Sequence, residues 1–146
     1  MLALFLSTIN MAAQTAYEYK IITTVESIVP MGIGRSRIVE ANANLDHKAA
    51  TSVREKSNHF KQNKTKRKAL KIPSFKETKL LNFYSMVGIN FQNIASNDAL
   101  VASKLTDLSK QGWHLFTVTS GVESDAGKGD GKGIFITRYI FRRPVK

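Results

Sequence analysis

Residues 97–120 read NDALVASKLTDLSKQGWHLFTVTS, and this stretch predicts a helix followed directly by a strand. Asn97 is a residue type that caps the start of a helix. Gly112 stands where a left-handed residue commonly ends one. Apolar residues recur at the i, i+4, i+7 spacing of one helical face, at Val101, Leu105 and Leu108. The helix should therefore bury this stripe on a neighbouring element.

Three longer stretches have the β-branched and aromatic composition of strands: residues 17–25, 113–120 and 134–143. Residues 36–40 favour a short additional strand. The apolar stretch 80–91 has an ambiguous period and favours a strand and a turn. A helix as long as the one expected here spans about the length of a seven-residue strand, so it can lie along the sheet. We therefore expect an α+β fold with a small antiparallel sheet of three to four strands and one main helix packed on one face.

The last strand is apolar on both faces. One face carries Ile134, Ile136 and Ile140, and the other carries Phe135, Tyr139 and Phe141. Since one helix covers only one face, the second must be covered by residues 80–91, by a partner or by a ligand. We take Phe135, Tyr139 and Phe141 as the candidate partner face, for an unidentified protein or for a second copy of the chain.

The first 13 residues are uncharged and apolar and end in small residues, as in a secretory signal. They are too short to span a membrane, and they lack the positive charges that usually open a signal. The alternative is a buried strand or helix of the fold itself. We expect residues 1–13 to be a signal peptide, and residues 14–146 to form a single secreted or periplasmic domain. A cytoplasmic location is the alternative. The chain has no cysteine, so neither a disulfide nor a thiolate site is possible.

The formal net charge is +11, and most of it lies in residues 48–79. Residues 41–72 overlap this basic segment and begin shortly before it. They are rich in Asn, Lys and Ser and poor in apolar side chains. They read as an insertion that lacks regular structure or forms a frayed helix. The candidate anion-binding residues are Arg35 and Arg37 in a glycine-containing loop and Lys64, Lys66, Arg67 and Lys68 in the insertion. Clustered Lys and Arg can bind a polyanion such as nucleic acid, anionic lipid or an acidic glycan. Export would disfavour nucleic acid.

The strand opening Glu18-Tyr19-Lys20, the helix end Gln111-Gly112-Trp113-His114-Leu115 and the closing Tyr139-Ile140-Phe141-Arg142-Arg143 carry a family resemblance. In this order they resemble a small bacterial domain family of unknown function with the pattern E-Y-K, G-W-E-L and F-K-R. The resemblance covers about half of the chain after residue 13. This chain departs from the pattern in having His114 where the family has Glu, and in its basic insertion and its glycine-rich connection, residues 121–133. The resemblance implies a strand, helix and hairpin fold and no known activity.

Motifs of catalysis and cofactor binding are incomplete in this sequence. The loop at residues 32–37 begins like a dinucleotide-binding turn but has Arg37 in place of the third glycine. Residues 125–131 lack the oxygen ligands of a calcium loop, and His47, His59 and His114 show no metal-ligand spacing. We therefore expect no metal and no cofactor.

The sequence favours a non-enzymatic exported domain that binds a protein partner or self-associates. One alternative is a polyanion-binding module acting through residues 48–79. The other is a cryptic enzyme using His114, Arg35 or Arg37.

Overall fold

The computed structural model describes residues 15–27, 36–54, 60–61, 65–85, 87–122 and 133–145. Its elements are β1 (Tyr17–Ser27), β2 (Arg37–Ala41), the 3-10 helix η1 (His47–Ala50), β3 (Val53–Arg54), β4 (Phe60–Lys61), the 3-10 helix η2 (Arg67–Leu70), β5 (Phe75–Lys79), β6 (Tyr84–Ser85), β7 (Gly88–Ile89), α1 (Phe91–Lys110), β8 (His114–Val122) and β9 (Ile134–Pro144). The α+β class, the antiparallel sheet and the single main helix are as predicted. The expected leader, residues 1–13, lies outside the described residues.

The main sheet has five strands in the order β5-β2-β1-β9-β8, and every neighbouring pair is antiparallel. The prediction of three to four strands is therefore too low. β5 was missed because its sequence FKETK is polar and every one of its residues is exposed. The longest ladder joins β1 to β9 from Tyr17↔Pro144 to Ser27↔Ile134. β1 pairs with β2 over a much shorter stretch, residues 22–25.

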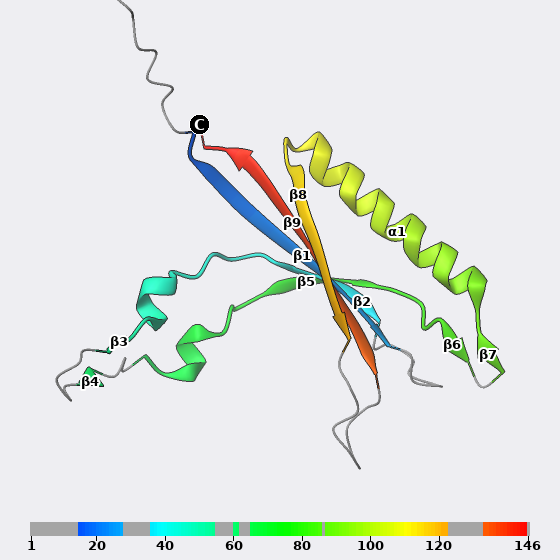
Figure 1. Cartoon of the computed structure of the whole chain (residues 1–146), viewed down its shortest axis with the longest axis horizontal. Helices are drawn as coiled ribbons and strands as arrows, with labels where there is room; N and C mark the ends of the chain where they lie inside the picture. The colour runs from blue at the N-terminus through cyan, green and yellow to red at the C-terminus, as the bar shows by residue number, and fades with distance from the viewer. Residues whose placement is uncertain are drawn as a thin grey trace, which may run out of the picture.

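α1 lies along one side of the sheet, beside β8, and the segment that contains η1 and η2 projects to the opposite side (Figure 1). Because successive residues of a strand point to opposite faces, the register sorts the side chains. The helix side carries the even-numbered residues of β1, and the core forms there from Ile22, Ile38, Leu80, Leu108, Trp113 and Phe141. Val101, Leu105 and Tyr139 pack against this core. The predicted stripe Val101, Leu105 and Leu108 therefore does face the sheet.

The helix begins at Phe91, seven residues before the start predicted with Asn97 as its cap. Its N-cap is Asn90, whose side-chain oxygen accepts a hydrogen bond from the Asn93 N–H at 3.2 Å. Asn97 does not cap the helix, because its side chain is buried in a tertiary contact described below. The C-terminal prediction is right: Gly112 has a φ of 80°, and Trp113 N–H donates to the Leu108 carbonyl at 3.1 Å.

Residues 80–91 supply a short hairpin, β6–β7, and not a strand of the main sheet. Leu80 enters the core, and the Phe83 ring lies 6.2 Å from that of Phe135. Phe135 is on the helix side because it is in register with Glu26 of β1. This segment therefore contributes to the helix side and leaves the other face of the sheet uncovered.

The described part of the basic insertion contains more local structure than we expected. Asp46 accepts a hydrogen bond from Lys48 N–H, the Thr65 hydroxyl donates to the Ala49 carbonyl at 2.7 Å, and β3 pairs with β4. Neither η1 nor η2 has a buried residue. The described part of the insertion is therefore held by hydrogen bonds, with no buried residue in either 3-10 helix. We call residues 42–74 the basic arm.

No helix within the described ranges is both long enough and apolar enough to cross a membrane.

Candidate anion-binding surface

The uncovered face of the sheet is lined by the odd-numbered residues of β1 and the even-numbered residues of β9. A register shift in β8 between Leu115 and Thr117 adds Phe116 to this face, where its ring meets Tyr19 edge-on at 6.2 Å. We call it the open face. Tyr19 is 57% exposed, Phe116 50% and Ile21 48%, so the part of this face around these three residues is open to solvent.

The residues that we expected to form a partner face lie on the other side. Phe141 is 2% exposed and Tyr139 packs against the core. Phe135 lies beside Phe83. Their position follows from the register, which pairs Phe141 with Lys20 and Tyr139 with Ile22 on the helix side of β1. Phe141 is therefore buried, and Phe135 and Tyr139 are half-buried by packing on the helix side, so these three side chains do not form an exposed aromatic face.

Two arginines of β9 lie on the open face. Arg138 is exposed, and Arg142 has its guanidinium carbon 4.7 Å from the Tyr17 ring centroid and 4.5 Å from that of Phe116. Within the described residues, neither arginine forms a salt bridge. They were not among the predicted anion-binding residues, although the period-2 alternation of residues 134–143 placed both on the Ile134, Ile136 and Ile140 face.

The predicted anion-binding residues are only partly brought together. Arg37, on the open face of β2, donates to the Glu77 carboxylate at 2.6 Å, so its charge is already paired. Lys66 precedes η2, and Arg67 and Lys68 open it, all exposed on the basic arm. Arg35 and Lys64 lie outside the described residues.

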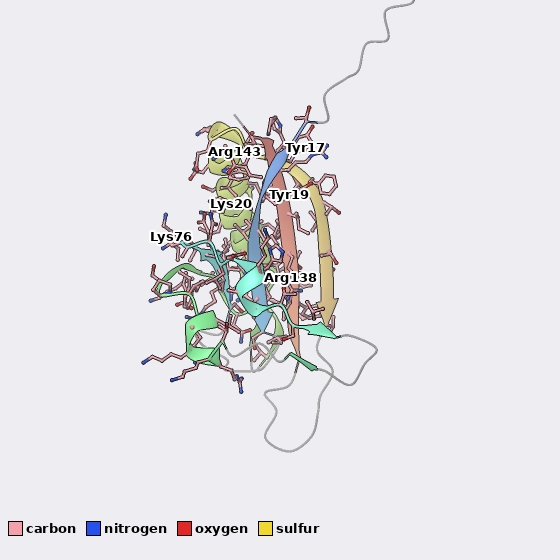
Figure 2. The ribbon with its side chains drawn as sticks, turned by 90° about the vertical axis from the view of Figure 1, so that its left-hand side faces the viewer. Tyr17, Tyr19, Lys20, Lys76, Arg138 and Arg143 are labelled. Atoms are coloured by element: carbon pink, nitrogen blue, oxygen red, sulfur yellow. The ribbon has the colours of Figure 1, made fainter. Side chains whose placement is uncertain are left out.

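The basic arm and the open face share one side of the molecule. Figure 2 looks at the sheet from the side opposite α1, with η1 and η2 in front of the strands and α1 behind them. Tyr17, Tyr19 and Arg138 follow one another down this side of the sheet. A groove of about 530 Å³ lies along the edge of β1 where β2 diverges. Tyr19, Lys20 and Lys76 line it, together with Glu18 and Glu40. This groove connects the open face to the base of the arm.

Most of the described acidic residues lie on the other side of the sheet, with α1. Among the described Asp and Glu residues, only Asp46 and Glu77 lie on the arm or the open face. The others lie on α1 or on the helix side of the sheet: Glu18, Glu26, Glu40, Asp98 and Asp107. On the arm, by contrast, the described cations include Lys48, Lys66, Arg67, Lys68 and Lys71. The positive charge of the described chain is therefore concentrated on the side opposite α1.

The acidic groups on the helix side are engaged in structural contacts. Glu40 accepts hydrogen bonds from Lys20 at 3.0 Å and from Lys104 at 2.6 Å. Burial alone would raise the pKa of the Glu40 carboxyl, but these two lysines outweigh burial and lower it below its usual value. Glu18 pairs with Arg143, which also lies 4.2 Å from the Trp113 ring centroid. The contacts of Glu40 join β1, β2 and α1, and the Glu18–Arg143 pair joins β1 to β9.

A second polar cluster lies under the first half of α1. Burial raises the pKa of Glu26; the hydrogen bond from Asn97 opposes this shift, and the charge of Asp98 adds to it. Burial likewise raises the pKa of the Tyr139 hydroxyl, against a hydrogen bond with Thr24 and in the same direction as the charges of Glu26 and Asp98. In the described residues no group of three His, Asp or Glu side chains is placed to hold a metal ion.

Searches against protein-family models, curated proteins and solved structures found no match for this chain. The resemblance to a small bacterial domain of unknown function therefore stays a prediction.

Proposed function

We propose that this protein is a non-enzymatic binding domain that holds an extended polyanion on the side opposite α1. The supporting observation is the segregation of charge. Within the described chain, cations without an acidic partner gather mainly on the basic arm and the open face, while five of the seven acidic residues lie on α1 or on the helix side of the sheet. A predominantly positive surface of this kind attracts polyanions over several ångströms and releases their counterions on contact.

A second copy of the chain is a weaker candidate for the same surface. The open face does expose apolar area, at Tyr19, Ile21 and Phe116. Pairing two such faces, however, would bring Arg138 and Arg142 of both copies together without a described acid to neutralise them. Like charges placed opposite one another disfavour association.

We also propose that the domain acts outside the cytoplasm, on the strength of the apolar residues 1–13. The partner would then be an anionic component of the cell envelope or its surroundings. Sequencing the N-terminus of the protein recovered from its native host tests this proposal. A mature start near residue 14 supports export, and a retained Met1 in the cytoplasmic fraction contradicts it.

Heparin affinity measured at about 0.15 M salt, where exposed charges are screened within about 8 Å, tests the polyanion proposal. Lys68→Glu on η2 and Arg138→Glu on the open face should each weaken binding several-fold and reduce its dependence on salt. Lys110→Glu, at the end of α1, is the matched control because it changes the net charge equally. We expect it to have little effect.

Equal losses in all three variants would mean that only net charge matters, and would overturn the assignment to this surface. Absence of heparin binding by the unaltered chain would overturn polyanion binding altogether. Circular dichroism and thermal unfolding of each variant exclude misfolding as the cause of a loss.

A further inference from the structure

The Arg142 guanidinium is held in position by aromatic rings before any ligand arrives. It lies over the rings of Tyr17 and Phe116, at 4.7 and 4.5 Å from their centroids. Tyr19 is the direct register partner of Arg142 on β1, and its ring meets Phe116 edge-on at an interplanar angle of 71°. A guanidinium stacked in this way has already given up much of its side-chain freedom, so less is lost when a ligand binds.

The contacts with the two rings provide no hydrogen-bond acceptor for the N–H groups of Arg142. Aromatic faces contact the plane of a guanidinium, whereas its five N–H donors project from the edge of that plane. Within the described chain no carboxylate pairs with Arg142, although Glu18 pairs with the adjacent Arg143. A carboxylate accepts two parallel N–H···O bonds from such an edge, and this is the geometry that arginine offers and lysine does not.

We infer that Arg142 is a receptor for the carboxylate groups of an acidic polysaccharide, with Tyr19 as the neighbouring platform for a sugar ring. This inference rests on the proposed polyanion function and names the chemical class of the polymer. The face of an aromatic ring is negative, so the positively polarised C–H groups on one side of a sugar ring can pack on it. Tyr19 is the most exposed of the three rings.

Single-stranded nucleic acid fits this arrangement less well. Its bases stack on successive aromatic faces that are open to them. Here the guanidinium already covers one face each of Tyr17 and Phe116, and Tyr19 and Phe116 are in T-shaped contact with one another. The rings therefore hold an arginine in place and provide few free faces for bases.

Binding of the full chain to a fluorescent oligogalacturonate, compared with oligo(dT) of equal charge, tests the inference. Arg142→Lys keeps the charge but removes the planar donor edge. We expect it to weaken oligogalacturonate binding about tenfold, the equivalent of one charge-assisted hydrogen bond. Arg138→Lys on the same strand and face is the matched control, since no described ring stacks on Arg138, and it should lose less than about threefold.

A second variant alters the same site without changing its charge. Phe116→Leu keeps an apolar side chain but removes one wall of the stack, and we expect a loss of several-fold for oligogalacturonate. Its fold is checked by thermal unfolding, and its retained response to Lys68→Glu confirms that the charged surface is intact.

Equal losses in Arg142→Lys and Arg138→Lys would overturn the receptor role, and tighter binding of oligo(dT) would overturn the choice of a glycan. Both outcomes leave the proposed function standing as long as Lys68→Glu still weakens heparin binding. If the unaltered chain binds neither polymer nor heparin, the proposed function fails together with the inference.

Discussion

The side chain of Asn97, in the middle of α1, forms two hydrogen bonds with the backbone of Leu81. Its amide oxygen accepts from the Leu81 N–H at 2.7 Å, and its amide nitrogen donates to the Leu81 carbonyl at 2.8 Å. The same nitrogen also donates to Glu26 on β1 at 3.3 Å. One buried side chain thus links three segments: the helix, the segment before β6 and the central strand. The Asn97 side chain thus pairs with both backbone groups of Leu81, as the backbone of a neighbouring strand would.

Asn97→Ala should lower the free energy of unfolding by about 2 kcal/mol, because a buried backbone group left without a partner costs roughly 1–3 kcal/mol. Urea unfolding followed by circular dichroism measures this change. Ser96→Ala is the matched control: its hydroxyl bonds only to the Gln92 carbonyl of its own helix. It should change the value by less than about 0.5 kcal/mol. A similar small effect of Asn97→Ala would contradict the linking role.

Glu40→Gln should destabilise the fold by about 2 kcal/mol at neutral pH, because it leaves Lys20 and Lys104 without a carboxylate partner. The pKa of Glu40 is lowered in the folded protein, so its contribution is present above the usual carboxyl value of 4.5. That contribution is lost as the pH falls through the lowered folded pKa. Unfolding measured from pH 7 to pH 2 should therefore show the unaltered protein and the variant converging at the acid end.

Glu18→Gln is the control for this pH series, because the Glu18–Arg143 pair is exposed. Such a pair contributes less than about 1 kcal/mol. If Glu18→Gln flattened the acid dependence as much as Glu40→Gln, the lysine pair at Glu40 would not be its source.

Glu26→Gln should raise the free energy of unfolding at pH 7, by roughly 0.5 kcal/mol for a partly solvated charge. The pKa of Glu26 is raised in the folded protein. Its charged form therefore opposes folding, and this cost develops as the pH rises from the usual value of 4.5 through the folded pKa. Glutamine stays neutral and can still accept the hydrogen bond from Asn97. The stability gain should vanish below pH 4.5, and a gain that is independent of pH would refute the electrostatic explanation.

Gly112→Ala should lower the free energy of unfolding by about 1 kcal/mol. The cost comes from conformation alone, because φ is 80° and no atom lies within 4 Å of the position that the new Cβ would take. Gly121 also has open space around its Cβ position, but its φ lies outside the left-handed region. Gly121→Ala is therefore the control, with no expected loss; thermal unfolding compares the two. Equal losses would point to a cause other than the backbone at Gly112.

The sequence was informative where a single element carries its own signal. The apolar stripe of α1 and the left-handed position of Gly112 were both predicted correctly, since periodicity and backbone conformation are local properties. The start of α1 was not, because Asn97 looks like a cap until its contact with Leu81 is known. β5 was also missed, because its residues are polar and its strand structure depends on pairing with β2, which the local sequence does not reveal.

The arrangement of the candidate site depends on the register between strands that lie far apart in the sequence. Alternation along β9 already placed Arg138 and Arg142 on one face. The stack of Arg142 on Tyr17 and Phe116, however, requires the pairing of β1 with β9 and the irregularity in β8 that brings Phe116 to this face. No local pattern encodes these two features. For that reason the partner was expected on the Phe135, Tyr139 and Phe141 face, which lies on the helix side of the sheet.

The β1–β9 ladder also has a consequence for the order in which the fold can assemble. β1 is synthesised early, but its longest partner strand ends at Pro144, so the central pairing must wait for nearly all of the intervening chain. Pairings across such sequence separations form slowly, typically in about milliseconds to seconds. Until β9 emerges, the nascent β1 has only β2 beside it, over residues 22–25. A sheet that closes last at its centre leaves most of β1 without a partner strand until the final residues of the chain have been made.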